Sequence, residues 1–159
     1  MELQNMSWGD NMIVIEPFED EMASLKEAHE HGSFEYANPL RTFSSCVRLH
    51  FSRTKRLEKY GVYVVRQRSI GEVLYIGKGG TIDPEGKFRE QDIPDRLTNV
   101  KAHDISANRW FANLCQEKGP LLIEYVFLST SKSPALVEAT LLQAYLNEHH
   151  RLPYKNKSL

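Results

Sequence analysis

The sequence predicts an α+β domain with a small, mainly antiparallel three-stranded sheet that is flanked by helices. Two short runs of β-branched and aromatic residues lie close together in the middle of the chain, and a third lies nearer its end. Around these runs, apolar residues recur at helical spacing. From residue 60 onward the predicted order is strand, strand, helix, helix, strand, helix.

The first two strands and the first helix have local signals. The runs from Gly61 to Arg66 and from Val73 to Gly77 are separated by a polar segment containing Gly71, which predicts a β-hairpin. The segment from Gly79 to Pro94 is rich in Gly, Pro and Asp and predicts a long loop. We expect a short helix from Asp95 to Lys101.

The later elements have stronger signals. Leu121 to Leu128 predicts the third strand. Ser133 and Pro134 fit the N-cap and first position of a last helix that runs to about His149. Before the third strand, five apolar residues at helical spacing precede Gly119 and Pro120, which favour a helix end. These five residues are Ala107, Trp110, Phe111, Leu114 and Cys115.

Residues 1–59 form an N-terminal flank that we expect to pack on the domain of residues 60–159. Within the flank, Met12 to Glu16 predicts a short strand, and Asp20 to His31 predicts a polar helix that ends at Gly32.

The net charge of −1 hides an uneven distribution. Residues 1–40 contain one Lys and nine Asp or Glu and carry −8, whereas residues 41–159 carry +7. A basic surface can neutralise DNA phosphates, although an uneven solvated surface has the same composition. We expect residues 1–40 either to weaken that attraction or to supply a strand or helix to the core.

Composition limits the class of protein. The chain has 159 residues, of which 41% are hydrophobic and 26% charged, as in ordinary folded globular proteins. Its longest apolar run is far shorter than the roughly 20 residues that span a bilayer. The acidic N-terminal stretch is not typical of a secretion signal. We therefore expect a single-domain cytoplasmic protein that does not enter a membrane.

Glu138 lies on an apolar stripe of the last predicted helix, together with Leu141, Leu142 and Tyr145. A carboxylate on such a stripe needs a cation, a hydrogen-bond donor or a metal, because burying an unpaired charge is costly. This position alone leaves a structural ion pair with a nearby Lys or Arg and a metal site both open.

Two glycine-containing strings lie on the predicted hairpin. Gly61-Val62-Tyr63 begins its first strand, and Tyr75-Ile76-Gly77 ends its second strand, directly before Lys78. An arginine on the short helix, a glutamate on the last helix and an asparagine near residue 159 follow: Arg96, Glu138 and Asn156. In this order the pieces resemble the GIY-YIG nuclease family over residues 60–159, with Val62 where the family has Ile.

The resemblance implies a metal-dependent endonuclease that hydrolyses the phosphodiester bonds of DNA. Glu138 would bind Mg²⁺, or Mn²⁺ in its place. Arg96 would hold the phosphate with two donors in a planar fork, and Asn156 would orient the region around Glu138. Arg89 is a competing candidate for the arginine, because the stretch between Lys78 and Arg96 is long for the family.

The tyrosines would handle the attacking water. Tyr63 would receive or relay its proton, with Lys78 and the metal lowering the pKa of the phenol. Tyr75 would position the water or the phosphate by hydrogen bonding.

Two other functions stay open: a nucleic-acid-binding module of the same fold without activity, and a small-molecule enzyme in which Glu138 is the general base. We expect DNA as the partner, and a homodimer is possible.

Overall fold

The computed structural model describes residues 14–37 and 41–159, and these residues form an α+β fold. The main sheet has four strands in the order β1-β6-β2-β3, and all neighbouring strands are antiparallel. A small second sheet pairs two short strands, β4 and β5. The strands are β1 (His31–Tyr36), β2 (Gly61–Gln67), β3 (Val73–Gly79), β4 (Thr81–Ile82), β5 (Phe88–Arg89) and β6 (Leu121–Phe127).

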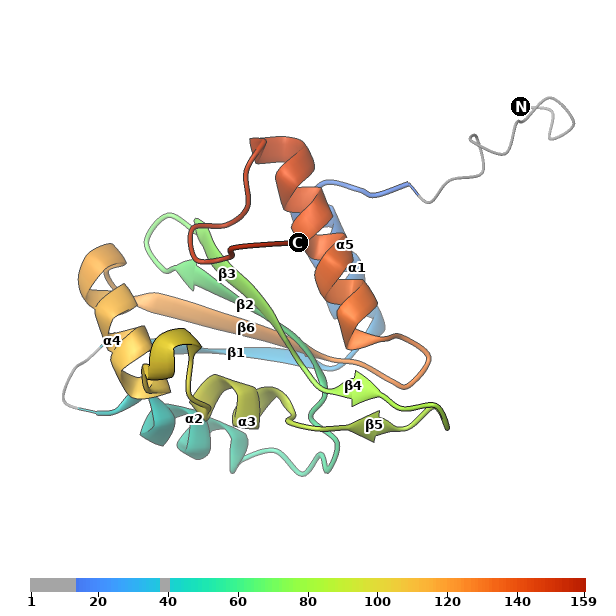
Figure 1. Ribbon diagram of the computed structural model, residues 1–159, viewed down its shortest axis with the longest axis horizontal. Coiled ribbons are helices and arrows are strands. Elements are labelled where there is room, and N and C mark those ends of the chain that lie inside the picture. The colour runs from blue at the N-terminus through green and yellow to red at the C-terminus, as the bar shows by residue number, and fades with distance from the viewer. Residues whose placement is uncertain (1–13, 38–40) are drawn as a thin grey trace, which may run out of the picture.

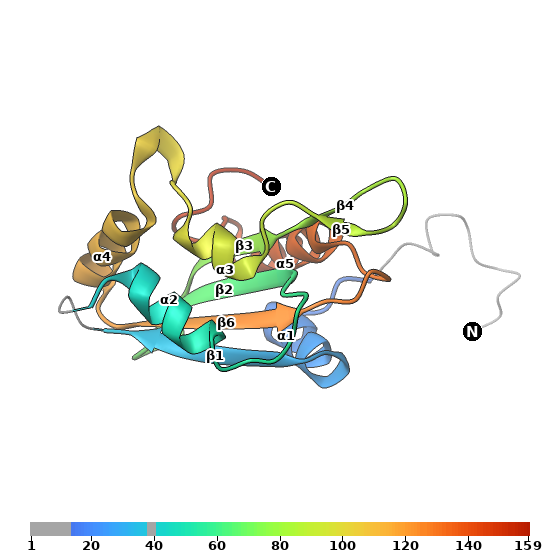
Figure 2. The same ribbon diagram turned by 90° about the horizontal axis from the view of Figure 1, so that it is seen from below.

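Helices cover both faces of the main sheet (Figure 1). One face carries α1 (Phe18–Ala28) and α5 (Pro134–His149). Three helices lie on the other face (Figure 2): α2 (Phe43–Phe51), α3 (Ile93–Thr98) and α4 (Ala107–Lys118), with a short 3-10 turn (Ala102–Asp104) before α4.

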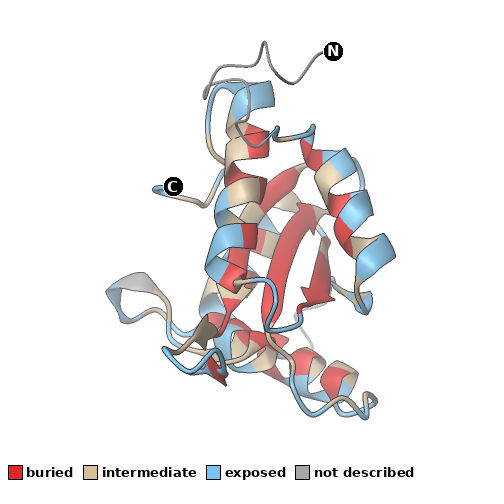
Figure 3. Ribbon diagram, turned by 90° about the vertical axis from the view of Figure 1, so that its right-hand side faces the viewer, coloured by how far each residue is buried: buried red, intermediate tan, exposed pale blue. Residues whose placement is uncertain are grey.

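The alternation of side chains along β2 produces one core on each face. Val62 and Val64 pack on the side of α1 and α5, whereas Tyr63 and Val65 pack on the side of α2, α3 and α4. All four residues are buried, as Figure 3 shows for the central strands. Because β2 is buried on both faces, its sequence is a continuous apolar run rather than an alternating one.

The sequence predicts a three-stranded sheet, and this prediction is wrong because the main sheet has a fourth strand, β1. Helix α1 ends at Ala28, and the predicted helix end at Gly32 belongs instead to β1, whose six residues pair with β6. A Cβ at Gly32 would lie 2.4 Å from the Tyr125 hydroxyl. Gly32 therefore marks the close approach of a tyrosine to a strand, not a helix end.

The described part of the N-terminal flank belongs to the folded unit. Helix α1 packs on α5, β1 pairs with β6, and α2 is an additional helix capped by Thr42, whose hydroxyl accepts from the Ser45 amide at 3.2 Å. Deleting residues 1–40 would remove α1 and β1, so such a deletion cannot report on charge alone. The strand expected from Met12 to Glu16 begins outside the described residues, and residues 14–16 are not a strand.

The remaining elements are present, some with shifted ends. The hairpin of β2 and β3, the strand β6 and the Ser133 cap of α5 are confirmed. The predicted loop contains β4 and β5. Helix α3 begins at Ile93 rather than Asp95, because Asp92 accepts a hydrogen bond from the Asp95 amide at 3.0 Å and Pro94 fits the first turn.

In the parts of the chain that the structure describes, none of the helices has both the length and the apolar composition to cross a bilayer.

Candidate active site

The predicted site residues meet at the outer edge of β3, where α3 approaches from one face and α5 from the other. A pocket of about 730 Å³ at this edge is lined by four of the six: Tyr75, Arg96, Glu138 and Asn156. Arg96 also lines a neighbouring pocket of about 580 Å³ together with Lys78. Tyr63 is buried beside Tyr75, with 6.0 Å between their ring centroids.

Two glycines of β3 allow this site to close. Gly77 lies directly opposite Tyr63 in the hairpin, and a Cβ there would be 2.4 Å from the tyrosine ring. A Cβ at Gly79 would be 2.4 Å from the backbone nitrogen of Ile93, at the start of α3. The glycines thus permit close contact of β3 with a side chain and with a helix, which larger residues would prevent.

The two tyrosines are buried to different extents, and burial is the main influence on both. Burial raises the pKa of Tyr63 well above 10, and the neighbouring Tyr75 raises it further, while Arg96 lowers it. Burial and the charge of Glu138 raise the pKa of Tyr75, while Arg96 and a hydrogen bond with Tyr63 lower it. For Tyr63, desolvation outweighs Arg96, and the expected effect of Lys78 and a bound metal stays a prediction.

Glu138 lies at the edge of the buried stripe of α5. Leu141, Leu142 and Tyr145 are buried as the spacing predicts, and Glu138 is half-buried and faces the larger pocket. Burial raises its pKa, against the opposing effects of Lys78 and Arg96. None of the ion pairs found among residues 14–37 and 41–159 includes Glu138. Its carboxylate is therefore available to a further cation.

The two candidate arginines have different surroundings. Arg89 lies on β5, where its Nε donates to the Asp83 carboxylate at 2.7 Å. Arg96 is exposed on α3, lines both pockets and is near enough to Glu138 to lower its pKa. Of the two guanidinium groups, only that of Arg96 lies with the tyrosines and the glutamate.

Asn156 holds the C-terminal segment against β3. Its Oδ1 accepts from the Ile76 amide and its Nδ2 donates to the Ile76 carbonyl, both at 2.9 Å. The Lys155 amide also donates to the Leu74 carbonyl at 2.8 Å. The contacts of Asn156 therefore fix the strand that carries Tyr75, rather than Glu138 as the resemblance implies.

Of the lining residues of the larger pocket that were not predicted, Lys101 and Trp110 bear most on its chemistry. Lys101 is half-buried there, and its Nζ donates to the Arg96 carbonyl at 2.7 Å. Trp110, assigned from its spacing to the apolar face of α4, is half-buried at the pocket. The sequence around Lys101 does not indicate that it lies at the pocket, because the course of the turn before α4 brings it there. For Trp110 the available signal was its position at the border of the apolar face of α4, where a side chain is only partly buried.

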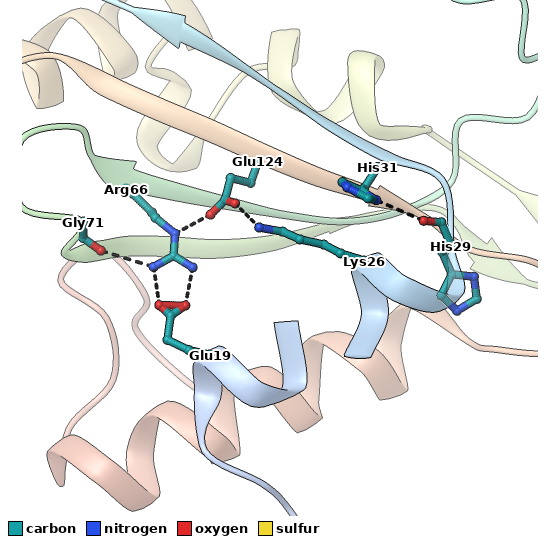
Figure 4. Close-up of polar contacts among 7 residues, drawn as sticks. All are labelled: Glu19, Lys26, His29, His31, Arg66, Gly71 and Glu124. Carbon is teal, nitrogen blue, oxygen red and sulfur yellow. Dashed lines mark hydrogen bonds and ion pairs between the residues drawn. The ribbon is translucent and has the colours of Figure 1, made fainter. Parts of the chain in front are cut away.

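A second group of charges lies away from both pockets, under α1, on the face of the sheet that α1 and α5 cover (Figure 4). The buried Arg66 forms a two-pronged ion pair with Glu19, at 2.9 and 2.5 Å, and a second ion pair with Glu124. Lys26 also pairs with Glu124. Burial opposes these charges, but Lys26 and Arg66 together lower the pKa of Glu124. This network joins α1 to the sheet and has no part in the pockets.

In comparisons with family models, curated proteins and solved structures, nothing matches this chain. The resemblance to GIY-YIG nucleases therefore rests on the motif residues.

Proposed function

We propose that the protein is a metal-dependent DNA endonuclease of the GIY-YIG type. The observation that supports this most is the convergence of residues from four separate segments at one edge of β3. Tyr63 and Tyr75 come from the hairpin, Arg96 from α3, Glu138 from α5 and Asn156 from the C-terminal segment. An accidental match of short motifs gives no reason for such a convergence.

The carboxylate of Glu138 suits a divalent metal ion. Within the described residues no three His, Cys, Asp or Glu side chains gather into a ready-made metal site. One carboxylate is nevertheless enough for Mg²⁺, which keeps several waters and takes other ligands from substrate phosphates. When bound, Mg²⁺ would supply positive charge for the phosphate and the leaving oxygen.

Arg96 would bind the phosphate that is cut. Its guanidinium group is exposed at both pockets and free of the ion pair that occupies Arg89. Two N–H groups in a fixed plane can follow the phosphate oxygens as negative charge grows on them.

The tyrosine pair would take the proton of the attacking water. Tyr75 lines the pocket, whereas Tyr63 is buried beside it, so Tyr75 is the phenol that meets the water. As the water oxygen bonds to phosphorus, the water proton would pass to Tyr75 in its ionised form, and the leaving oxygen would take a proton from solvent when its bond to phosphorus breaks. Tyr63 and Arg96 both favour the ionised form of Tyr75, and neutralising the Glu138 charge would favour it further.

The direct test is incubation of the protein with supercoiled plasmid in Mg²⁺, in Mn²⁺ and in EDTA. We expect nicked and linear DNA with either metal and none in EDTA, and no cutting by Glu138→Gln. Glu27→Gln is the matched control, because Glu27 is exposed on α1 and lines neither pocket. Retarded but uncut plasmid under all conditions would favour the inactive binding module instead.

A further inference from the structure

Two chemically different groups of side chains line the larger pocket, and we call them its cationic wall and its aromatic wall. Four cationic side chains stand against the single carboxylate of Glu138: Arg96, Lys101, Lys155 and Lys157. The other wall is apolar and aromatic, and comprises Val100, Ile105, Trp110, Phe111 and Leu142. A surface that binds only a sugar-phosphate backbone needs the first wall and not the second.

In the cationic wall, Lys101 and Arg96 are neighbouring charges without counter-ions. Lys101 is fixed by its bond to the Arg96 carbonyl and lies 5.6 Å from the centroid of the Phe111 ring. Burial, and then the charge of Arg96, lower its pKa to about 8. Neither Lys101 nor Arg96 takes part in an ion pair within the described ranges. A bound phosphate would relieve their repulsion, which makes this an anion site.

The aromatic wall is built around Trp110. Its ring packs edge to face on Tyr75, at 5.5 Å between centroids, and on Phe111, at 4.7 Å. These contacts hold a large aromatic side chain at the pocket and beside a candidate catalytic tyrosine. Nucleic-acid bases that are not stacked in a duplex bind to such aromatic side chains.

The smaller pocket on the other side of Arg96 is different. Its lining has no apolar side chain and consists of Lys78, Gly80, Glu90, Gln91, Asp95 and Arg96. In an unbroken duplex the base faces are covered by stacking, so only phosphates, sugars and base edges are offered to a protein. The polar pocket suits that surface, whereas the aromatic wall of the larger pocket needs an exposed base.

We propose that the larger pocket binds one unpaired DNA nucleotide next to the cut, with Lys101 at its phosphate and Trp110 against its base. This inference rests on the proposed function and names the substrate class: DNA that splays or branches at the cutting site, rather than an unbroken duplex.

The test measures binding of fluorescein-labelled DNA in EDTA, so that binding is separated from metal-dependent cutting. The two probes are a duplex and a splayed DNA of equal length that opens into two single strands. We expect the wild type to bind the splayed DNA at least about tenfold more tightly. Trp110→Leu should reduce that preference to about twofold or less and leave duplex affinity unchanged, since base stacking on an aromatic side chain contributes strongly to affinity.

Lys101→Gln is the second variant, because it leaves the packed side chains of Trp110 and Phe111 in place and removes only the charge beside them. It should weaken splayed-DNA binding about fivefold and duplex binding by less than twofold. Lys87→Gln, at an exposed position between β4 and β5, is the control with the same loss of charge. Circular dichroism melting shows whether each variant is folded, and if Trp110→Leu is not, Lys101→Gln decides.

Equal affinity of the wild type for both DNAs, or equal losses on both in the folded variants, overturns the inference. Cutting assays then separate it from the proposed function. A wild type that cuts unbroken duplex as fast as splayed DNA is a nuclease without this subsite. A wild type that cuts neither DNA but keeps a Trp110-dependent preference has the subsite without the nuclease activity.

Discussion

Arg66 and Arg96 are two arginines of one small fold in opposite electrostatic situations. Arg66 is buried and fully engaged, because Glu19 and Glu124 bind its guanidinium group and Lys26 balances the second carboxylate. Arg96 is exposed at two pockets, and Glu138 and Lys101 beside it likewise have no ion-pair partner among the described residues. Satisfied charges hold elements together, whereas unsatisfied charges gathered at a pocket await a ligand.

The charges around Arg66 and those around Arg96 form two clusters. Between them, the largest expected difference in cutting and in stability is that between Glu138→Gln and Glu124→Gln. The first should reduce cutting at least about 100-fold and leave the melting temperature unchanged or higher, because it removes a half-buried charge without a partner. The second should leave cutting intact and lower the free energy of unfolding by about 2 kcal/mol, because it removes a partner of a buried arginine. Plasmid nicking and thermal melts measure both effects, and the reverse pattern would break the comparison.

Replacing the arginines with lysine gives a second, smaller contrast. Arg96→Lys should lose about 10- to 100-fold in cutting rate at unchanged stability, since a point charge cannot replace the planar fork. Arg66→Lys should cut normally, but its free energy of unfolding should be lower by about 1–2 kcal/mol, because the two-pronged contact with Glu19 is lost.

Arg89→Lys is the control for the choice of arginine and should be close to wild type in both assays. Normal cutting by Arg96→Lys together with loss in Arg89→Lys would transfer the phosphate-binding role to β5.

The smallest effect is a difference in pH dependence. The pKa of Glu138 is raised in the folded protein, so its contribution to stability is present below its ordinary value of 4.5 and is lost as pH rises through the folded value. The pKa of Glu124 is lowered, so its contribution is present above 4.5 and is lost as pH falls through the folded value.

Melting temperatures between pH 3 and pH 7, measured against the two Gln variants, test these signs. Relative to Glu138→Gln, the wild type should lose stability as pH rises, and relative to Glu124→Gln it should gain. Each kcal/mol corresponds to about 2–4 °C in a chain of this size. Slopes of the same sign in the two comparisons would contradict the contrast between the clusters.

Much of the fold around the site could be predicted, because its signals are local. The hairpin has β-branched runs on both sides of a polar turn, and Ser133 with Pro134 is a helix start that depends on adjacent residues only. On α5, Leu141, Leu142 and Tyr145 follow Glu138 at spacings of three, four and seven residues, which places Glu138 beside the buried stripe.

The missing strand has a physical explanation. Residues 31–36 form an edge strand in which burial alternates, but Gly32 adds no side chain to the inner face, so only Phe34 and Tyr36 are apolar there, which is too short a pattern to indicate a strand. Pairing with β6, far along the chain, makes them a strand. Helix α2, by contrast, has Phe43, Val47 and Phe51 at helical spacing behind a Thr cap, and this signal could have been recognised.

The sequence could predict the residue types of the site, but not how deeply each residue is buried or how the pocket is formed. The spacing of Tyr75, Arg96 and Glu138 says nothing of how deeply each is buried, and burial determines the pKa directions found here. The double contact of Asn156 with Ile76 and the position of Lys101 depend on two loops whose course has no sequence signature.

The C-terminal segment also affects how copies of this protein could associate. An unpaired edge strand is a template on which another chain can add a strand and start an aggregate. At β3 that template is occupied, because Lys155 binds the Leu74 carbonyl and the side chain of Asn156 takes both polar groups of Ile76. A second copy could extend the sheet at β3 only by displacing Asn156, so strand exchange between copies would begin at β1, away from the pockets.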